Sequence, residues 1–259
     1  MSLQLYWLFW KKQALFSLQT LLVTKWGSLI FILGKFVRYF FFLTVIIRVG
    51  EQTKLVAGYS IDQLITFFLI YNMIDLLGQL FFRGVYFFRD LIVDGTFDFV
   101  LLKPLNPLFQ VLTGYIDMLD IPLLLVVLVS LLIQNLHASF MTIVLYLIAI
   151  GISLLVLVAF HILVVAFGII FFEVDSIVML FRDLSRMGQL PVDIYQSAVR
   201  FVITYIIPIA IIMNLPAKAL LNLISWQNLV LSLGIAIVVL ILSLWFWQQA
   251  LKQYSSASS

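Results

Sequence analysis

Only a few ionisable side chains stand within or beside long apolar stretches, where a charge is unfavourable and usually functional. Asp75 follows Asn72 by about one helical turn, so both are candidates to face a polar interior and line a translocation path. Asp117 and Asp120 stand at the start of an apolar stretch, where a helix N-terminus favours negative charge, and we interpret them as structural. His161 is a lone imidazole in an apolar stretch, for which we expect a hydrogen bond to a neighbouring helix.

Several kinds of catalytic site are missing from the sequence. No G-x-x-x-x-G-K-[ST] phosphate-binding loop occurs, because the only Gly-Lys pair, Gly34-Lys35, lacks the upstream glycine and the following Ser or Thr. No G-x-S-x-G or H-E-x-x-H motif occurs, and the chain has no cysteine and only 2 histidines. We therefore expect neither enzyme activity nor a cofactor or metal in this chain. The net charge of +3 is small and spread out, so no nucleic-acid partner is expected.

The elements that carry these residues are predicted from composition. Hydrophobic residues make up 64% of the 259 and charged residues only 10%, far from the balance of a soluble domain. A bilayer accommodates such a chain, and there the backbone must be helical because it finds no water to bind. We therefore predict an all-α membrane protein, a single transmembrane domain over 1–259 with about six spanning helices.

The apolar stretches give the expected spans. They fall at about 27–49, 61–82, 115–134, 140–172, 197–214 and 228–250. Lys35 and Arg38 lie inside the first, and we expect them to snorkel to the cytoplasmic interface, which would slide that span toward 36–57. The fourth is too long for a simple crossing and is expected to be one long helix that protrudes from the membrane.

Residues 3–24 combine a polar stripe with many aromatic side chains. Gln4, the Lys11-Lys12 pair and Gln19 recur at a spacing of seven to eight residues. This pattern favours an amphipathic interfacial helix lying flat on the cytoplasmic surface of the lipid bilayer. The alternative is a first transmembrane span, which the lysine pair at its centre makes unfavourable.

The polar stretch 83–107 carries the most information. Tyr86–Asp94 reads as a short amphipathic helix, and Gly95 is expected to end it as a C-terminal cap. Residues 103–107, Lys-Pro-Leu-Asn-Pro, form a stiff turn before the next span. A floppy linker would not need these features, so we interpret the segment as a rigid cytoplasmic surface that docks a soluble partner.

At this point the sequence resembles a known family. The run RGVYFFRDLIVDGTFDFVLLKPLNPLFQVL resembles the signature loop of ABC-2 type ATP-binding-cassette exporter permeases, in their compact six-span branch of mostly unassigned substrate. The runs AGYSIDQLITFFLIYN and LPVDIYQSAVRFVITYIIPIAIIMNLPAKAL are similar to the same branch. Together the resemblance covers most of residues 55–250.

This resemblance implies an arrangement that composition does not. It implies a dimer of two permeases in a prokaryotic inner membrane, each docking a separate nucleotide-binding ATPase subunit that binds ATP and Mg. The first cytoplasmic loop would hold the coupling helix, at about 86–98, and residues 3–24 would be the elbow helix. The substrate would move between the permeases along spans two and five. The residues we expect to contact the ATPase are Tyr86, Arg89, Asp90, Asp94, Asp98 and Lys103.

The topology near the C-terminus is open. With both termini in the cytoplasm, most of the 15 lysine and arginine residues lie inside, as the positive-inside rule requires, and 173–196 is then cytoplasmic. The family resemblance implies instead that 191–225 form a re-entrant hairpin on the outer side.

Two functions are consistent with these sequence features. The first is the permease subunit of an ATP-driven exporter, whose apolar and aromatic interior suits a hydrophobic or amphipathic cargo. The alternative is an ion- or proton-coupled carrier that uses Asp75 and His161 as a relay, although the spans hold few ionisable groups for one. A lipid-modifying enzyme would need acids, histidines or a nucleophile clustered at one depth, and the sequence offers none.

Overall fold

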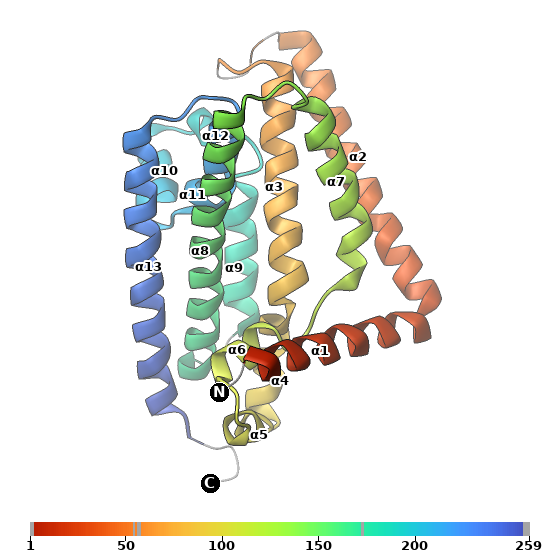
Figure 1. The fold of residues 1–259 in the computed structure, drawn as a ribbon, viewed down its shortest axis with the longest axis vertical. Helices are drawn as coiled ribbons and strands as arrows, with labels where there is room; N and C mark the ends of the chain where they lie inside the picture. Colours follow the sequence, from red (N-terminus) through yellow and green to blue (C-terminus); the bar gives the residue numbers. More distant parts are fainter. Residues whose placement is uncertain (1–2, 54, 56–57, 172–173, 256–259) are drawn as a thin grey trace.

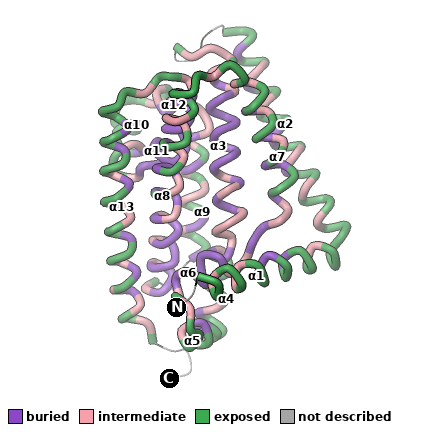
Figure 2. The backbone as a smooth tube through the Cα atoms, in the orientation of Figure 1, coloured by how far each residue is buried: buried purple, intermediate pink, exposed green. Residues whose placement is uncertain are grey.

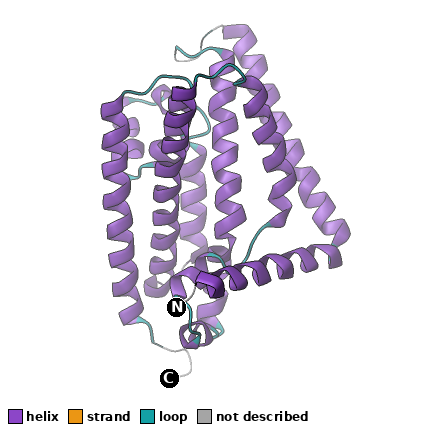
Figure 3. Cartoon of the chain, in the orientation of Figure 1, coloured by secondary structure: helices purple, strands orange, loops and turns teal. Residues whose placement is uncertain are grey.

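The structure is a computed structural model that describes residues 3–53, 55, 58–171 and 174–255. It is 84% helical, and the described residues form no β-sheet (Figure 3). The fold class is therefore all-α, as the composition predicts.

Long helices lie side by side along the longest axis of the molecule (Figure 1). They are α2 (Lys25–Thr53), α3 (Ile61–Phe82), α7 (Ile121–Gln134), α8 (Phe140–Phe171), α9 (Val174–Arg186) and α13 (Trp226–Gln253). The helix α1 (Leu3–Val23) runs across one end of this bundle, which is also the end where α4 (Phe88–Val93) and the last turns of α13 lie. We call this the α1 end and the opposite one the far end.

Helix length and composition separate the described helices into two classes. Four are long and apolar enough to cross a membrane: Lys25–Thr53, Ile61–Val93, Phe140–Phe171 and Trp226–Gln253. Two shorter apolar helices cover Met118–Gln134 and Ser197–Ile206. Residues of α2 and α13 are mostly exposed, whereas α3 is mostly buried and α8 is buried over the inner part of its length (Figure 2), so α3 and α8 form the centre.

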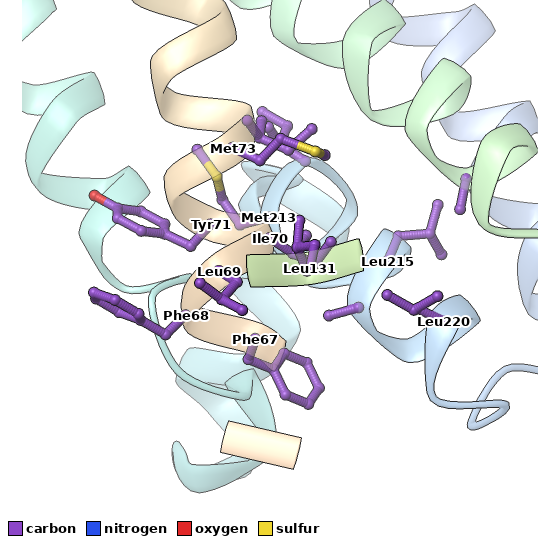
Figure 4. Packing of buried hydrophobic residues seen from close by; sticks show 14 of the residues in the cluster. Phe67, Phe68, Leu69, Ile70, Tyr71, Met73, Leu131, Met213, Leu215 and Leu220 are labelled. Atoms are coloured by element: carbon purple, nitrogen blue, oxygen red, sulfur yellow. The ribbon is translucent and has the colours of Figure 1, made fainter. Parts of the chain in front are cut away.

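The packing around α3 explains its unbroken apolar sequence. Phe67 and Ile70 are fully buried, and Leu131, Met213 and Leu215 from other helices belong to the same cluster (Figure 4). A helix that is surrounded on all sides needs no polar face. Its start is fixed by a capping box, in which the Ser60 hydroxyl accepts from the Gln63 N–H and the Gln63 side chain accepts from the Ser60 N–H.

The third expected span, 115–134, begins later than its apolar pattern predicts. Residues 113–117 are not helical, the 3₁₀ turn η2 covers Met118–Asp120, and α7 starts at Ile121. Pro122 lies in the first turn of α7, the one part of a helix that tolerates its missing N–H. The Asp117 carboxylate accepts a hydrogen bond from the Leu119 N–H and so stabilises η2, the turn just before α7.

The stretch 173–196 differs from the expected cytoplasmic loop. Phe172 and Glu173, the expected boundary of the fourth span, lie outside the described residues. Val174 packs against Gly168 near the α1 end, whereas Asp193 accepts a 2.6 Å hydrogen bond from the Tyr59 hydroxyl just before α3, at the far end. The segment therefore runs the length of the bundle, mostly as α9, instead of staying at one end.

The expected span 197–214 is not one helix. It divides into α10 (Ser197–Phe201), the π-helix η4 (Val202–Ile206) and α11 (Ile209–Met213), and α12 (Leu215–Leu220) follows. Pro208 explains the break after η4, because it has no N–H to continue the helix. The segment folds back at the far end (Figure 1), which resembles the hairpin of the family more than the charge-based interpretation.

Candidate functional site

The polar stretch at the α1 end is a compact structure, with η1 (Arg83–Phe87), α4 and α5 (Phe97–Leu102) in sequence. Phe88 and Phe97 are fully buried and meet edge-to-face with ring centroids 5.2 Å apart. Gly95 has a φ of 68° and follows the last turn of α4, which confirms the predicted cap. The aromatic residues therefore anchor the segment and leave its charged residues outside.

Most of the expected contact residues are exposed on this segment, and we call the part of the segment that carries them the charged surface. Arg89, Asp90, Asp94 and Lys103 are all exposed there. The Arg89 guanidinium lies 3.9 Å from the Asp175 carboxylate of α9. The half-buried Asp98 carboxylate accepts a 3.0 Å hydrogen bond from the Tyr254 hydroxyl beyond α13, so it joins this segment to the C-terminal region.

Tyr86 differs from the other expected contact residues because it faces the bundle. Its ring lies 5.3 Å from the Arg83 guanidinium carbon, and its side chain lines a small internal cavity together with Asp75. It is therefore placed to support the segment from inside rather than to contact a soluble partner.

Backbone contacts fix the segment to its surroundings. A Cβ on Gly84 would lie 2.5 Å from the Val111 carbonyl oxygen, so only glycine allows this approach to α6 (Pro107–Leu112). The Gln110 amide donates to the Val100 and Leu105 carbonyls, both at 3.0 Å. Such multiple attachments make a rigid unit.

Helix α1 is joined to the same unit. The Tyr6 hydroxyl accepts from the Asn106 N–H at 3.3 Å, and the Tyr6 and Phe109 rings meet edge-to-face at 4.9 Å. The Ser17 hydroxyl accepts from the Ile116 N–H at 3.4 Å. That α1 lies on a membrane surface stays a prediction.

A buried ion-pair cluster lies where α2, the end of α3 and the turn before α7 meet. The Lys35 ammonium donates to the Asp120 carboxylate and lies 3.7 Å from Asp117, and the Arg83 guanidinium lies 3.4 Å from Asp117. The Asp120 side chain is fully buried and that of Lys35 is 10% exposed. Lys35 therefore does not snorkel as expected, because two carboxylates at the start of α7 neutralise it inside the protein.

The cluster continues into the bundle as a line of polar side chains. The Arg83 guanidinium donates to the Gln79 amide oxygen at 3.0 Å, and the Gln79 amide nitrogen donates to Asp75 at 2.9 Å. Arg38 of α2 and Arg182 of α9 interact electrostatically with Asp75. We call the chain of Arg83, Gln79 and Asp75 the polar line; it leads from the start of η1 to the small cavity that Gln79 and Asp75 line.

The other candidate path residue, Asn72, is not part of this line. It is buried, and its amide donates at 2.8 Å to the Phe68 carbonyl one turn earlier on α3. The structure therefore brings Asp75 to other charges but leaves Asn72 bonded within its own helix.

His161 lines the same small cavity as Asp75. Its Nδ1 lies 2.8 Å from the Leu157 carbonyl oxygen of its own helix, so the expected hydrogen bond to a neighbouring helix is not the one observed. Its ring packs between Phe82 at 5.0 Å and Phe181 at 5.4 Å. The cavity of about 10 Å³ has room for about one water molecule.

Sequence reasoning missed the pairing of charges inside apolar stretches. Lys35 and Arg38 were visible in the first expected span, but their partners, which are distant in sequence, could not be assigned. The useful signal is that a cation within an apolar stretch needs a buried carboxylate. Among the residues that the structure describes, no three His, Cys, Asp or Glu side chains gather as metal ligands would.

Comparison with known proteins supplies the family. No curated protein and no solved structure matched this chain. The model of one family, described as ABC-2 family transporter protein, matches residues 33–258, which include all the helices from α3 to α13. The chain therefore belongs to the ABC-2 transporter family and is a membrane permease of that type.

Proposed function

We propose that this permease is the membrane subunit of an ATP-driven exporter, and that it works as a dimer with a separate ATPase subunit. The observation that supports this most directly is the rigid charged surface at the α1 end, which continues inward as the ion-pair cluster and the polar line. In this proposal ATP and Mg bind to the ATPase, and this chain supplies no catalytic group.

The charged surface is the proposed docking site for the ATPase. Arg89, Asp90, Asp94 and Lys103 offer both signs of charge within one short segment, which favours specific pairing. Phe88 lies directly beneath and packs against Gly168 of α8. A push on this surface would therefore reach α8 directly, and α2 through Arg83, Asp117 and Lys35.

The exposed face of α9 supports a translocation path between two permeases. It carries Asp175, Asp183 and Arg186, whose side chains are 63%, 67% and 58% exposed, beside exposed Met179 and Leu180. Charged groups facing lipid at this depth would be unfavourable, so the face is expected to border water or a second permease. Its mixture of charged and apolar groups suits an amphipathic cargo.

This function implies a membrane topology. We propose that α2, α3, α7, α8, α9 and α13 each cross the inner membrane, and that α1 lies on its cytoplasmic surface. The α1 end would then be cytoplasmic, together with both termini.

A matched pair of charge swaps tests the docking site. The swap R89D/D90R keeps the net charge but reverses the local pattern on the charged surface. The swap R48E/E51R does the same to an exposed pair at the far end of α2, where the side chains lie 3.1 Å apart. We expect R89D/D90R to lower the amount of ATPase co-purifying with the tagged chain roughly tenfold, as when charge pairs across an interface are reversed.

The control R48E/E51R should retain the ATPase at the wild-type level. If no phosphate-loop ATPase co-purifies with the wild type, or if both swaps behave alike, the docking proposal is wrong.

A proton-coupled carrier is the second candidate, because Asp75 and His161 line one cavity. Transport that continues without ATP, stops when the proton gradient is removed and is lost in D75N would support it. Transport that depends on ATP and survives removal of the gradient would exclude it.

A further inference from the structure

A cavity of about 450 Å³ opens at the far end, away from the charged surface. It lies between the folded-back segment, from α10 to α12, and the first turns of α13. It belongs neither to the polar line nor to the exposed face of α9.

One end of the cavity is charged. The Lys218 ammonium lies 2.7 Å and the Arg200 guanidinium 3.7 Å from the Asp193 carboxylate, which also accepts from the Tyr59 hydroxyl at 2.6 Å. Two cations therefore share one carboxylate, and the cluster keeps a positive excess. The Arg200 side chain is 48% exposed, so its remaining donors are available to an anion.

The charged end lies at the level where the long helices begin. Lys218 is one turn before Asn222, whose side chain accepts at 2.8 Å from the Thr142 hydroxyl at the start of α8. Trp226 opens α13 and is 55% exposed, as expected of a tryptophan at a membrane interface. The charged end is therefore at headgroup depth if α8 and α13 span the bilayer.

The other end of the cavity is apolar and deeper. Ile211 of α11 and Ile235 of α13 line it. Ile235 is nine residues after Trp226, which places it about 13 Å further along the helix. Phe201, Tyr205 and Leu231 also line the cavity and are 56%, 49% and 51% exposed, so it opens sideways toward the hydrocarbon of a bilayer.

We propose that this cavity binds an anionic phospholipid of the surrounding bilayer. The headgroup phosphate lies against Arg200 and Lys218, whose charged donors suit phosphate oxygens. One acyl chain lies along Leu231 and Ile235. Such a lipid also gives a reason for the positive cluster at the far end. The positive-inside rule places most lysine and arginine residues of this chain on the opposite, cytoplasmic side.

The test measures lipids that stay bound to the full-length chain. The protein is purified in detergent with equal amounts of phosphatidylglycerol and phosphatidylcholine, and native mass spectrometry counts the adducts. We expect the wild type to retain phosphatidylglycerol in preference. R200Q should retain roughly tenfold less, the effect of losing a hydrogen bond to a charged group, whereas the matched control R48Q should retain the wild-type amount.

Two further arms examine the cavity and the source of the phosphate. S232F places a large side chain on the cavity wall, where it fills part of the cavity without changing the charge. It should therefore lower the retention of phosphatidylglycerol as R200Q does. Excess inorganic phosphate should not displace the lipid, because it cannot occupy the apolar end. The proposal would be overturned if R200Q and R48Q lost equal amounts of lipid, or if inorganic phosphate displaced the lipid. It would also be overturned if a cross-linker placed at position 201 captured a second copy of the chain, which would then occupy the cavity in place of lipid. The binding assay needs no ATPase, so its result is independent of the proposed export function.

Discussion

Lys35 shows how a single residue can connect separate parts of this protein. Its helix, α2, is mostly exposed, yet its ammonium contacts carboxylates just before α7, and one of these contacts Arg83 after α3. Pairs buried this deeply are sensitive to the loss of one partner, because the remaining charge is left without compensation.

We predict that K35M destabilises the folded protein by about 3–5 kcal/mol, because Asp120 remains buried without its cation. The charge exchange K35D/D120K should recover part of this loss. The control is R48M, which removes an exposed pair with side chains 75% and 52% exposed and should cost less than about 1 kcal/mol. Thermal unfolding in detergent measures all three, and a K35M melting curve equal to that of R48M would contradict the interpretation.

Asp193 gives a prediction about pH. Burial alone would raise the pKa of its carboxyl, but Lys218, Tyr59 and Arg200 lower it more, and the net pKa lies below the ordinary value of 3.8. A depressed pKa contributes stability that is complete above the ordinary range and is lost as the pH falls through the lowered value. The difference in unfolding free energy between wild type and D193N should therefore be constant from neutral pH to about pH 5. It should shrink only as the pH falls below the ordinary carboxyl pKa of 3.8. A difference that already disappears near pH 6 would contradict this.

At the scale of elements, the attachment of η1 to α6 depends on one glycine. A Cβ on Gly84 would meet three backbone atoms, the Val111 oxygen at 2.5 Å, the Gly114 nitrogen at 3.0 Å and the Tyr115 nitrogen at 3.1 Å. Backbone atoms cannot rotate away as a side chain does, so the two elements would have to separate.

We predict that G84A destabilises this attachment by about 1–3 kcal/mol, the usual effect of overpacking. G151A is the matched control, because a Cβ there meets nothing within 4 Å, and alanine in a helix is normally favourable by about 0.5–1 kcal/mol. Limited trypsin digestion at the exposed Arg89 of α4, which follows η1 directly, should proceed faster in G84A and be unchanged in G151A. Equal digestion of the two variants would show that η1 does not need this close approach.

The sequence predicted some elements well and others poorly, for physical reasons. The α3 bounds match the expected 61–82, because a long apolar run has one stable form in a bilayer. The sequence did not predict α9 as a helix, because the charged residues on its exposed face are typical of a solvated loop. The segment 197–214 looked like a span because its composition is apolar, and only three-dimensional packing decides that it turns back at Pro208. The charged surface was predictable from local pattern, whereas the ion-pair cluster required contacts between distant residues.

The whole molecule has two ends of different character. The α1 end carries the charged surface, and the far end carries the folded-back segment and the lipid-sized cavity. This separation is expected if one end meets an ATPase and the other meets the outer leaflet. This assignment of the two ends requires residues 191–225 and residues 86–98 to lie on opposite sides of the membrane.

Cysteine labelling tests this topology directly, because the chain has no native cysteine. The variants T96C, H137C and Q196C each introduce one thiol at an exposed position, in the segment after α4, between α7 and α8, and just before α10. A membrane-impermeant maleimide added to intact cells should label H137C and Q196C, whereas T96C should react only after the cells are opened. Q196C is the deciding variant: the charge-based interpretation makes it behave like T96C, and the folded-back arrangement makes it behave like H137C. Labelling of Q196C only in opened cells would mean that α9 does not cross the membrane, and the proposed path along its exposed face would fail with it.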